Sequence, residues 1–221
     1  MNIFIDIETT PEQNPNMDEY KSQVKAPAQY KKQESIDKWL ADNAGKVAEE
    51  NWLKTSFDGG KGQIVCICAS AGGEVHKFYD ENELIVLGRF NDWVEENLPF
   101  EHATTAVKFV GHNVRNFDLP FLHKRMVINQ VKPKFKAVWH GRHGVHCFDT
   151  MEEWAGFNGR ISQDNLCKIL GIESSKSGGM DGSQVWPEFQ KGNLAKIADY
   201  CAEDVRCVIE MYNRMNWITG Q

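Results

Sequence analysis

The sequence predicts an α/β domain in which a mixed sheet is covered by helices. Three strand-like segments come first, and the glycine turn AGGE joins the second and third as a hairpin. Helical and strand-like segments then alternate to the end of the chain. With 221 residues, 41% of them hydrophobic, the chain can bury the core of one domain spanning 1–221.

The first strand is predicted at 2–8, where apolar and acidic residues alternate. Successive side chains of a strand point to opposite faces, so the isoleucines at positions 3, 5 and 7 share one face. Asp6 and Glu8 then lie together on the other face, beside Phe4.

Residues 11–62 are polar and charged, with large apolar residues at helix-like intervals. This pattern predicts a helical insertion between the first two strands. Two interpretations stay open: a solvated flap, or a clamp over a substrate.

The remaining elements follow from local periodicity and end signals. Strands are predicted at 64–69, 75–79, 107–111 and 145–148, and helices at 82–97, from the Asn116–Asp118 region to about Asn129, from Ser162 to Gly171, and at 193–215. Asn116 or Asp118 is expected to cap the second of these helices, and Gly171 to end the third. The segment SSKSGGMDGSQ predicts a mobile loop.

Composition excludes several classes of protein. A formal charge of −6 argues against non-specific coating of duplex nucleic acid. The charge does not exclude a nuclease, because bound cations would neutralise the carboxylates of its site. No apolar run is long enough to span a bilayer and no leader is evident, so a cytoplasmic location and no membrane partner are expected.

The cysteines lack the paired spacing of zinc sites and are predicted to be reduced core residues. They are Cys66, Cys68, Cys147, Cys167, Cys201 and Cys207. Cys66 and Cys68 alternate along one strand and should share a sheet face.

Helical geometry separates the acidic residues of the last predicted helix. At about 100° per residue, its apolar side chains form one stripe that should face the core. The stripe comprises Leu194, Ile197, Cys201, Val205, Val208, Tyr212 and Met215. Tyr200 and Asp204 lie at its edge, whereas Asp199 and Glu203 point toward solvent.

Several acids lie within or beside apolar stretches, where an ionised group is costly unless a cation compensates it. Asp6, Glu8, Asp118 and Asp204 therefore predict one metal site, with Tyr200 beside it. Alternatives stay open: Tyr200 as a helix-edge aromatic and Asp118 as a helix cap. A fifth acid, Asp149, is expected to be structural or to support the site.

The set and order of these residues resemble the DnaQ-like superfamily of 3′→5′ exonucleases, in the branch whose third motif contains tyrosine (DEDDy). The resemblance covers residues 1 to about 212 and is closest to the proofreading exonuclease domain of family B DNA polymerases and its stand-alone predicted relatives. It implies an RNase H-like fold with a five-stranded mixed sheet and two divalent cations, Mg²⁺ or Mn²⁺. The histidine branch would place its histidine where this chain has Asp199.

The resemblance also implies roles for these residues in two-metal hydrolysis. Asp6, Glu8 and Asp204 would hold the ion that activates water, with Asp6 bridging to a second ion that Asp118 serves. Tyr200 would orient the attacking water. Asn113 and Phe117 belong to the same motif and are expected to shape the pocket for the terminal nucleotide, although Phe117 could equally be a core residue.

These implications predict a metal-dependent enzyme that removes nucleotides from the 3′ end of single-stranded DNA. An exoribonuclease and a non-catalytic nucleic-acid-binding replication or repair module are the alternatives. A separate polymerase or replication protein is the expected partner. The basic segment 132–146, with Phe135 and Trp139 between its charges, either follows a single-stranded backbone or stays solvated.

Overall fold

A five-stranded mixed sheet forms the centre of the protein. The computed structural model describes residues 1–98, 107–136, 138–140, 143 and 146–218. The strands are β1 (Asn2–Thr10), β2 (Gln63–Ser70), β3 (His76–Tyr79), β4 (Lys108–Gly111) and β5 (Cys147–Asp149). Their order is β3-β2-β1-β4-β5, and β2 runs antiparallel to both of its neighbours, whereas β4 and β5 are parallel to β1. The predicted mixed sheet and hairpin are confirmed, and position 145 of the last predicted strand lies outside the described residues.

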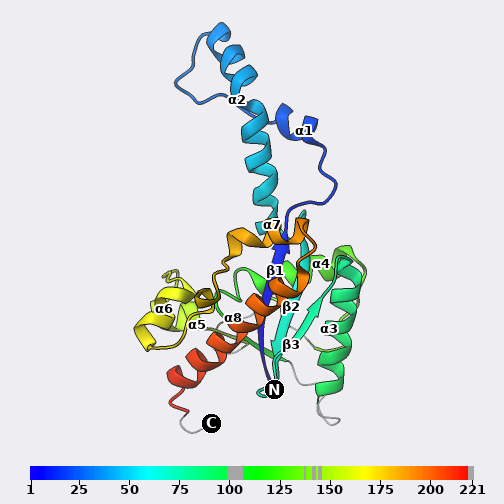
Figure 1. Cartoon of the computed structure of the whole chain (residues 1–221), viewed down its shortest axis with the longest axis vertical. Coiled ribbons are helices and arrows are strands. Elements are labelled where there is room, and N and C mark those ends of the chain that lie inside the picture. The colour runs from blue at the N-terminus through cyan, green and yellow to red at the C-terminus, as the bar shows by residue number, and fades with distance from the viewer. Residues whose placement is uncertain (99–106, 137, 141–142, 144–145, 219–221) are drawn as a thin grey trace.

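Helices cover both faces of this sheet (Figure 1). They are α1 (Met17–Ser22), α2 (Gln33–Leu53), α3 (Glu83–Asn97), α4 (Asp118–Ile128), α5 (Thr150–Ala155), α6 (Gln163–Leu170), α7 (Val185–Gln190) and α8 (Leu194–Met215), with 3-10 turns η1 (Lys54–Phe57), η2 (Ser175–Gly178) and η3 (Gly182–Gln184). The short helices α5 and α7 were not among the predicted elements. Among the described residues, no helix combines the length and apolar character needed to cross a membrane.

The alternation along β1 separates two hydrophobic cores. Ile3, Ile5 and Ile7 are buried with the apolar faces of α3 and α4. Phe4 instead belongs to the core that α8 closes on the other face of the sheet. Asp6 and Glu8 therefore lie on the α8 side, as the period of two predicts.

The ends of α6 and α4 test the predicted capping residues. Ser162 caps α6 by accepting the N–H of Asn165, and Gly171 ends it with a left-handed φ of 65°, so both predictions are confirmed. Neither Asn116 nor Asp118 caps α4, whose N-cap is Phe117 without a side-chain hydrogen bond. Asp118 lies inside the first turn, because its carboxylate accepts the N–H of Ile7 on β1 at 3.2 Å.

The segment 174–184, for which a mobile loop is predicted, contains the two 3-10 turns η2 and η3. Ser174 accepts the N–H of Lys176 at the start of η2, and Asp181 accepts the N–H of Ser183 in η3. Met180 between them is buried in the core beneath α8. The side-chain caps and the buried methionine together hold this segment against the domain.

Between β1 and β2, the chain forms a projecting helical arm made of α1, α2 and η1 (Figure 1). Tyr20, Val24 and Ala48 form a small core within this arm. At its base, Trp52 donates its indole N–H to the carbonyl of Glu12 at 2.7 Å. The ring of Trp52 also meets Trp186 of α7 edge-on, with 5.5 Å between centroids. The arm is thus packed within itself and anchored where it leaves the sheet.

Candidate active site

Three carboxylates from β1 and α8 converge on one side of the sheet. Asp6 and Glu8 come from β1 and Asp204 from α8, and one oxygen of each lies within 4.8 Å of the other two. Asp204 is buried, whereas Asp6 and Glu8 are half-buried. The group is therefore open to solvent along β1 and closed beneath α8.

The apolar stripe of α8 determines which of its acids reaches this group. Ile197, Cys201 and Val205 are fully buried against the sheet. Tyr200 lies at the edge of the same core, in agreement with the helical geometry. Asp199 instead points outward, where its carboxylate pairs with Lys77 at 2.5 Å.

Asp118 approaches β1 from the side of β4. The strand β4 pairs with β1 as far as Phe4, and the Asp118 carboxylate then accepts the N–H of Ile7 farther along β1. Asp118 is buried, and after burial and Asp204 its charge is a further cause of the raised pKa of both Asp6 and Glu8. The structure thus brings all four predicted acids to one end of β1, three as a close group and Asp118 beside them.

Burial and mutual repulsion disfavour ionisation throughout this cluster. Burial first, and repulsion from Asp204 second, hold the pKa of Asp6 and of Glu8 well above the usual range. Burial likewise raises the pKa of Asp118 to about 7 and that of Asp204 to about 6. The donor set fits hard divalent cations such as Mg²⁺ or Mn²⁺, which prefer carboxylate oxygens and would relieve this repulsion.

Tyr200 supplies a neutral phenol at the edge of the carboxylate group. Burial first, and the negative charge of Asp204 second, raise the pKa of its hydroxyl above the ordinary value. The phenol therefore keeps its proton at physiological pH and can donate a hydrogen bond.

Gln163 is a residue of this site that the sequence did not indicate. From the first turn of α6, its amide Nε2 donates to the carboxylate of Asp204 at 2.5 Å and to the Asp204 carbonyl at 3.3 Å. The hydroxyl of Ser175 and the charge of Lys176 also act on Asp204 and lower its pKa, although burial outweighs them. No local sequence signal marks these contacts, because they arise where α6 and η2 pack against α8.

A cavity of about 1070 Å³ lies beside the start of α4, and both residues predicted to shape a nucleotide pocket line it. Asn113 adopts a left-handed φ of 60° there. Phe117 is half-buried against the α3–α4 core and lies 6.4 Å from Phe57 of η1, ring centre to ring centre. Phe117 therefore packs against the core and also lines the cavity, and the base of the arm contributes the cavity wall at Phe57.

Asp149 has a structural position. It is fully buried, and its carboxylate accepts the backbone N–H groups of Asn113 at 2.9 Å, Arg115 at 3.1 Å and Met151 at 3.0 Å. These bonds tie the turn after β4 to the start of α5. Asp149 acts on the site indirectly, since its charge contributes to the raised pKa of Asp118.

The basic segment that follows α4 does not present aromatic rings to a ligand. Phe135 is buried, and Trp139 stacks on His123 with 5.5 Å between ring centres. Lys134 pairs with Asp92 and Glu95 of α3 at 2.7 and 2.9 Å. The interpretation of this segment as a track for a single strand is therefore wrong for its aromatic residues, which pack in the core.

Comparison with known proteins assigns this arrangement to a family. Residues 64–221 match the model of a family described as a predicted 3′-5′ exonuclease related to the exonuclease domain of PolB. The chain belongs to this family. No curated protein matches it. The match to this family confirms the prediction of a 3′-5′ exonuclease with an RNase H-like fold. Exonucleases of this kind are metal-dependent.

The family match covers Asp118, Tyr200 and Asp204 but begins after β1. Asp6 and Glu8 lie outside the matched residues, and the three-dimensional arrangement groups them with Asp204. The fold therefore brings two acids from outside the matched region to acids inside it.

The raised pKa values predict how pH and cations act on stability. A folded-state pKa above the unfolded value means that the folded protein binds more protons, so the free energy of unfolding falls as pH rises through this window. For Asp118 the window runs from its ordinary value of 3.8 to about 7. Without metal, wild type should lose stability across it more steeply than Asp118→Asn, whose amide oxygen can still accept the Ile7 N–H.

Urea unfolding at several pH values, with EDTA or with MnCl₂, measures this difference. Manganese should stabilise wild type more above about pH 7, where the carboxylates are ionised, than near pH 5. If the free energy of unfolding in EDTA depended on pH identically in wild type and Asp118→Asn, the raised pKa of Asp118 would be contradicted.

Gln163→Ala should weaken cation binding while leaving the fold intact. Outer-shell partners that orient a ligand typically contribute 10- to 100-fold in metal affinity, and we expect a loss of roughly 10-fold. Titration of Mn²⁺, followed by calorimetry or by its paramagnetic resonance signal, gives the affinity. Asn165→Ala is the matched control, because Asn165 is on the same helix but lines the cavity. Equal affinities for wild type and Gln163→Ala would show that Asp204 needs no positioning by Gln163.

Proposed function

We propose that this protein is a metal-dependent 3′→5′ exonuclease of the tyrosine (DEDDy) type that hydrolyses phosphodiester bonds from the 3′ end of single-stranded DNA. The observation that carries the proposal is the convergence of Asp6, Glu8 and Asp204 within 4.8 Å. The family match supplies the direction of cleavage.

Residues from β1, α4 and α8 would hold the cations. Asp6, Glu8 and Asp204 form the close donor group, and Asp118 is the further carboxylate beside β1. Bound divalent cations would supply charge neutralisation at the phosphate and a lowered pKa of the attacking water. Gln163 keeps the Asp204 carboxylate in place for this purpose.

The chain itself orients the reactants. In the proposed reaction, water attacks phosphorus, the bond from phosphorus to the 3′ oxygen breaks, and a nucleoside 5′-monophosphate leaves. The Tyr200 phenol is protonated and lies beside Asp204, so its hydroxyl can hold the attacking water or a phosphate oxygen. The outward position of Asp199 supports the tyrosine type, since a side chain at that position points away from the acids.

The cavity beside α4 is the proposed place for the terminal nucleotide. Phe117 and Phe57 offer ring faces for base stacking, and Asn113 offers amide groups for hydrogen bonding. A cavity of this kind suits an unpaired end, since a base must leave the duplex to stack between side chains. A cytoplasmic location and a separate polymerase or replication partner remain predictions.

End-labelled oligonucleotides test the activity. With Mg²⁺ or Mn²⁺, we expect single-stranded DNA to shorten stepwise from its 3′ end, and EDTA to stop the reaction. Asp118→Ala should lower the rate by roughly 10³-fold, since a lost metal ligand removes several kcal/mol of transition-state stabilisation. Asp199→Ala, which removes an exposed acid from α8, is the matched control and should retain activity.

The same time courses separate the alternatives. Faster shortening of RNA of the same sequence would favour an exoribonuclease. Absence of metal-dependent shortening of either polymer, with binding retained, would favour a non-catalytic module. Near-normal turnover by folded Asp118→Ala would contradict the assignment of the site.

Tyr200→Phe should slow the chemical step without weakening substrate binding. The substitution removes only the phenol oxygen and preserves the ring that packs against the α8 core. We expect kcat to fall by roughly 10²-fold, the scale of a positioned proton donor, while KM changes little. A rise in KM at unchanged kcat would place Tyr200 in substrate binding instead of water orientation.

A further inference from the structure

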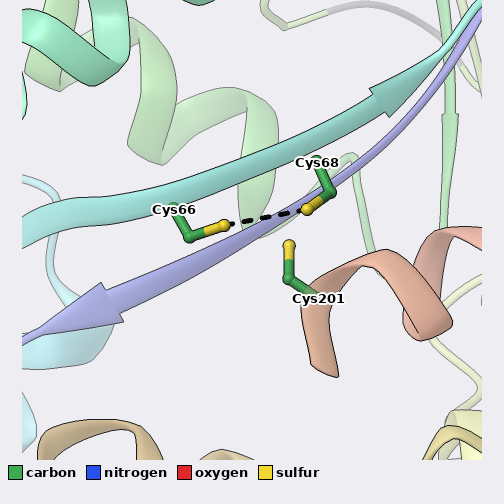
Figure 2. A group of neighbouring side chains, drawn as sticks. All are labelled: Cys66, Cys68 and Cys201. Atoms are coloured by element: carbon green, nitrogen blue, oxygen red, sulfur yellow. Dashed lines mark hydrogen bonds between the residues drawn. The ribbon is translucent and has the colours of Figure 1, made fainter. Parts of the chain in front are cut away.

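Three cysteine thiols converge in the core between the sheet and α8. Cys66 and Cys68 come from β2 and Cys201 from α8, and Figure 2 shows their sulfur atoms pointing toward one another. All three residues are fully buried. Their Sγ atoms lie within 4.8 Å of one another, and those of Cys66 and Cys68 are 3.7 Å apart.

These separations suit coordination of one metal ion. A zinc–thiolate bond of about 2.3 Å places sulfur ligands about 3.8 Å apart in a tetrahedral site and about 4.0 Å apart in a trigonal one. The 3.7 Å pair already meets this requirement. For a pair at the 4.8 Å limit, closure by less than about 1 Å suffices.

The present contacts of two of the thiols are weak. Cys68 donates to the carbonyl of Ala198 and Cys201 to that of Asp6, each at 3.4 Å. A thiol is a weak donor, so little is lost when these protons leave on metal binding. The carbonyl oxygens remain nearby, where one of them or water can complete a fourth position.

The thiols lie beside the carboxylate group on the same face of the sheet. Across the β1–β2 ladder, Cys68 is opposite Asp6 and Cys66 is opposite Glu8, so each pair shares a sheet face. Asp6 and Glu8 are half-buried, so the carboxylates that adjoin the thiols are themselves in contact with solvent.

We propose that Cys66, Cys68 and Cys201 form a binding site for a thiophilic divalent cation of the zinc class, distinct in ligand chemistry from the carboxylate site. Three thiols release three protons to solvent and form three metal–sulfur bonds. A divalent ion then leaves one net negative charge in the core, whereas a monovalent ion would leave two, which costs more in an apolar setting. The bound ion would link β2 to the helix that carries Tyr200 and Asp204.

Cadmium is the probe, because its bonds to thiolates give an ultraviolet charge-transfer band that bonds to carboxylates do not. Reduced, chelator-treated protein is titrated with Cd²⁺ in excess Mg²⁺, which occupies the carboxylates. We expect a band that saturates at a single ion per chain, and a rise in unfolding temperature when Zn²⁺ is added. Cys68→Ala and Cys201→Ala should each remove most of the band.

Cys207→Ala is the matched control, since Cys207 is another buried thiol of α8 outside this group. It should leave the band intact. X-ray absorption of the zinc-loaded wild-type protein provides a measurement that needs no variant, and we expect about three sulfur ligands.

Absence of the band, its persistence in folded Cys68→Ala, or a shell of oxygen ligands alone would overturn the proposal and leave the thiols as packing residues. The test uses no nuclease assay, so its outcome is independent of the proposed activity.

Discussion

Repulsion among carboxylates at one end of β1 is the constraint on which the rest of the structure depends. Burial and the neighbouring acids hold the pKa of Asp6 and Glu8 well above the usual range. Without a rigid scaffold, these groups would move apart or turn to solvent. The central strand prevents this for Asp6 and Glu8 because ladders on both sides of it and the isoleucines beneath it fix the backbone.

The magnitude of this cost explains the surrounding packing. Raising the pKa of Asp118 from 3.8 to about 7 corresponds to roughly 4 kcal/mol against its ionised form. Complete burial of one isoleucine contributes about 1.5–3 kcal/mol, so about two such residues are needed to offset one such carboxylate. Three buried isoleucines lie on the opposite face of β1, which is enough to offset one such carboxylate. They are Ile3, Ile5 and Ile7. A bound cation would offset this cost, which would couple the folded site to its metal.

Periodicity predicted the parts of the site that lie on long regular elements. The period of two along β1 placed Asp6 and Glu8 on the α8 side, and the stripe of α8 separated Asp204 from the exposed Asp199. The N-cap of α4 could not be predicted, because Asp118 bonds across to Ile7 and not within its own helix. Gln163 was missed for the same reason: it meets Asp204 41 positions away through tertiary packing. The thiol group also escaped prediction, since Cys201 joins a pair on β2 that spacing alone marks as core.

The helical arm contacts the strand that carries the acids at the base of the arm. Thr9, next to Glu8, donates its hydroxyl to the carbonyl of Ser56 in η1 at 2.7 Å. The pairing of β1 with β2 shifts between Glu8 and Thr9, so the strand is irregular where the arm is bonded to it. Phe57, the next residue of η1, forms part of the cavity wall. One short segment therefore connects the cavity to the strand that carries two of the acids. The family match begins after this segment. The arm is thus a feature of this chain outside the matched region, and it is bonded to β1 at Thr9, next to the site acid Glu8.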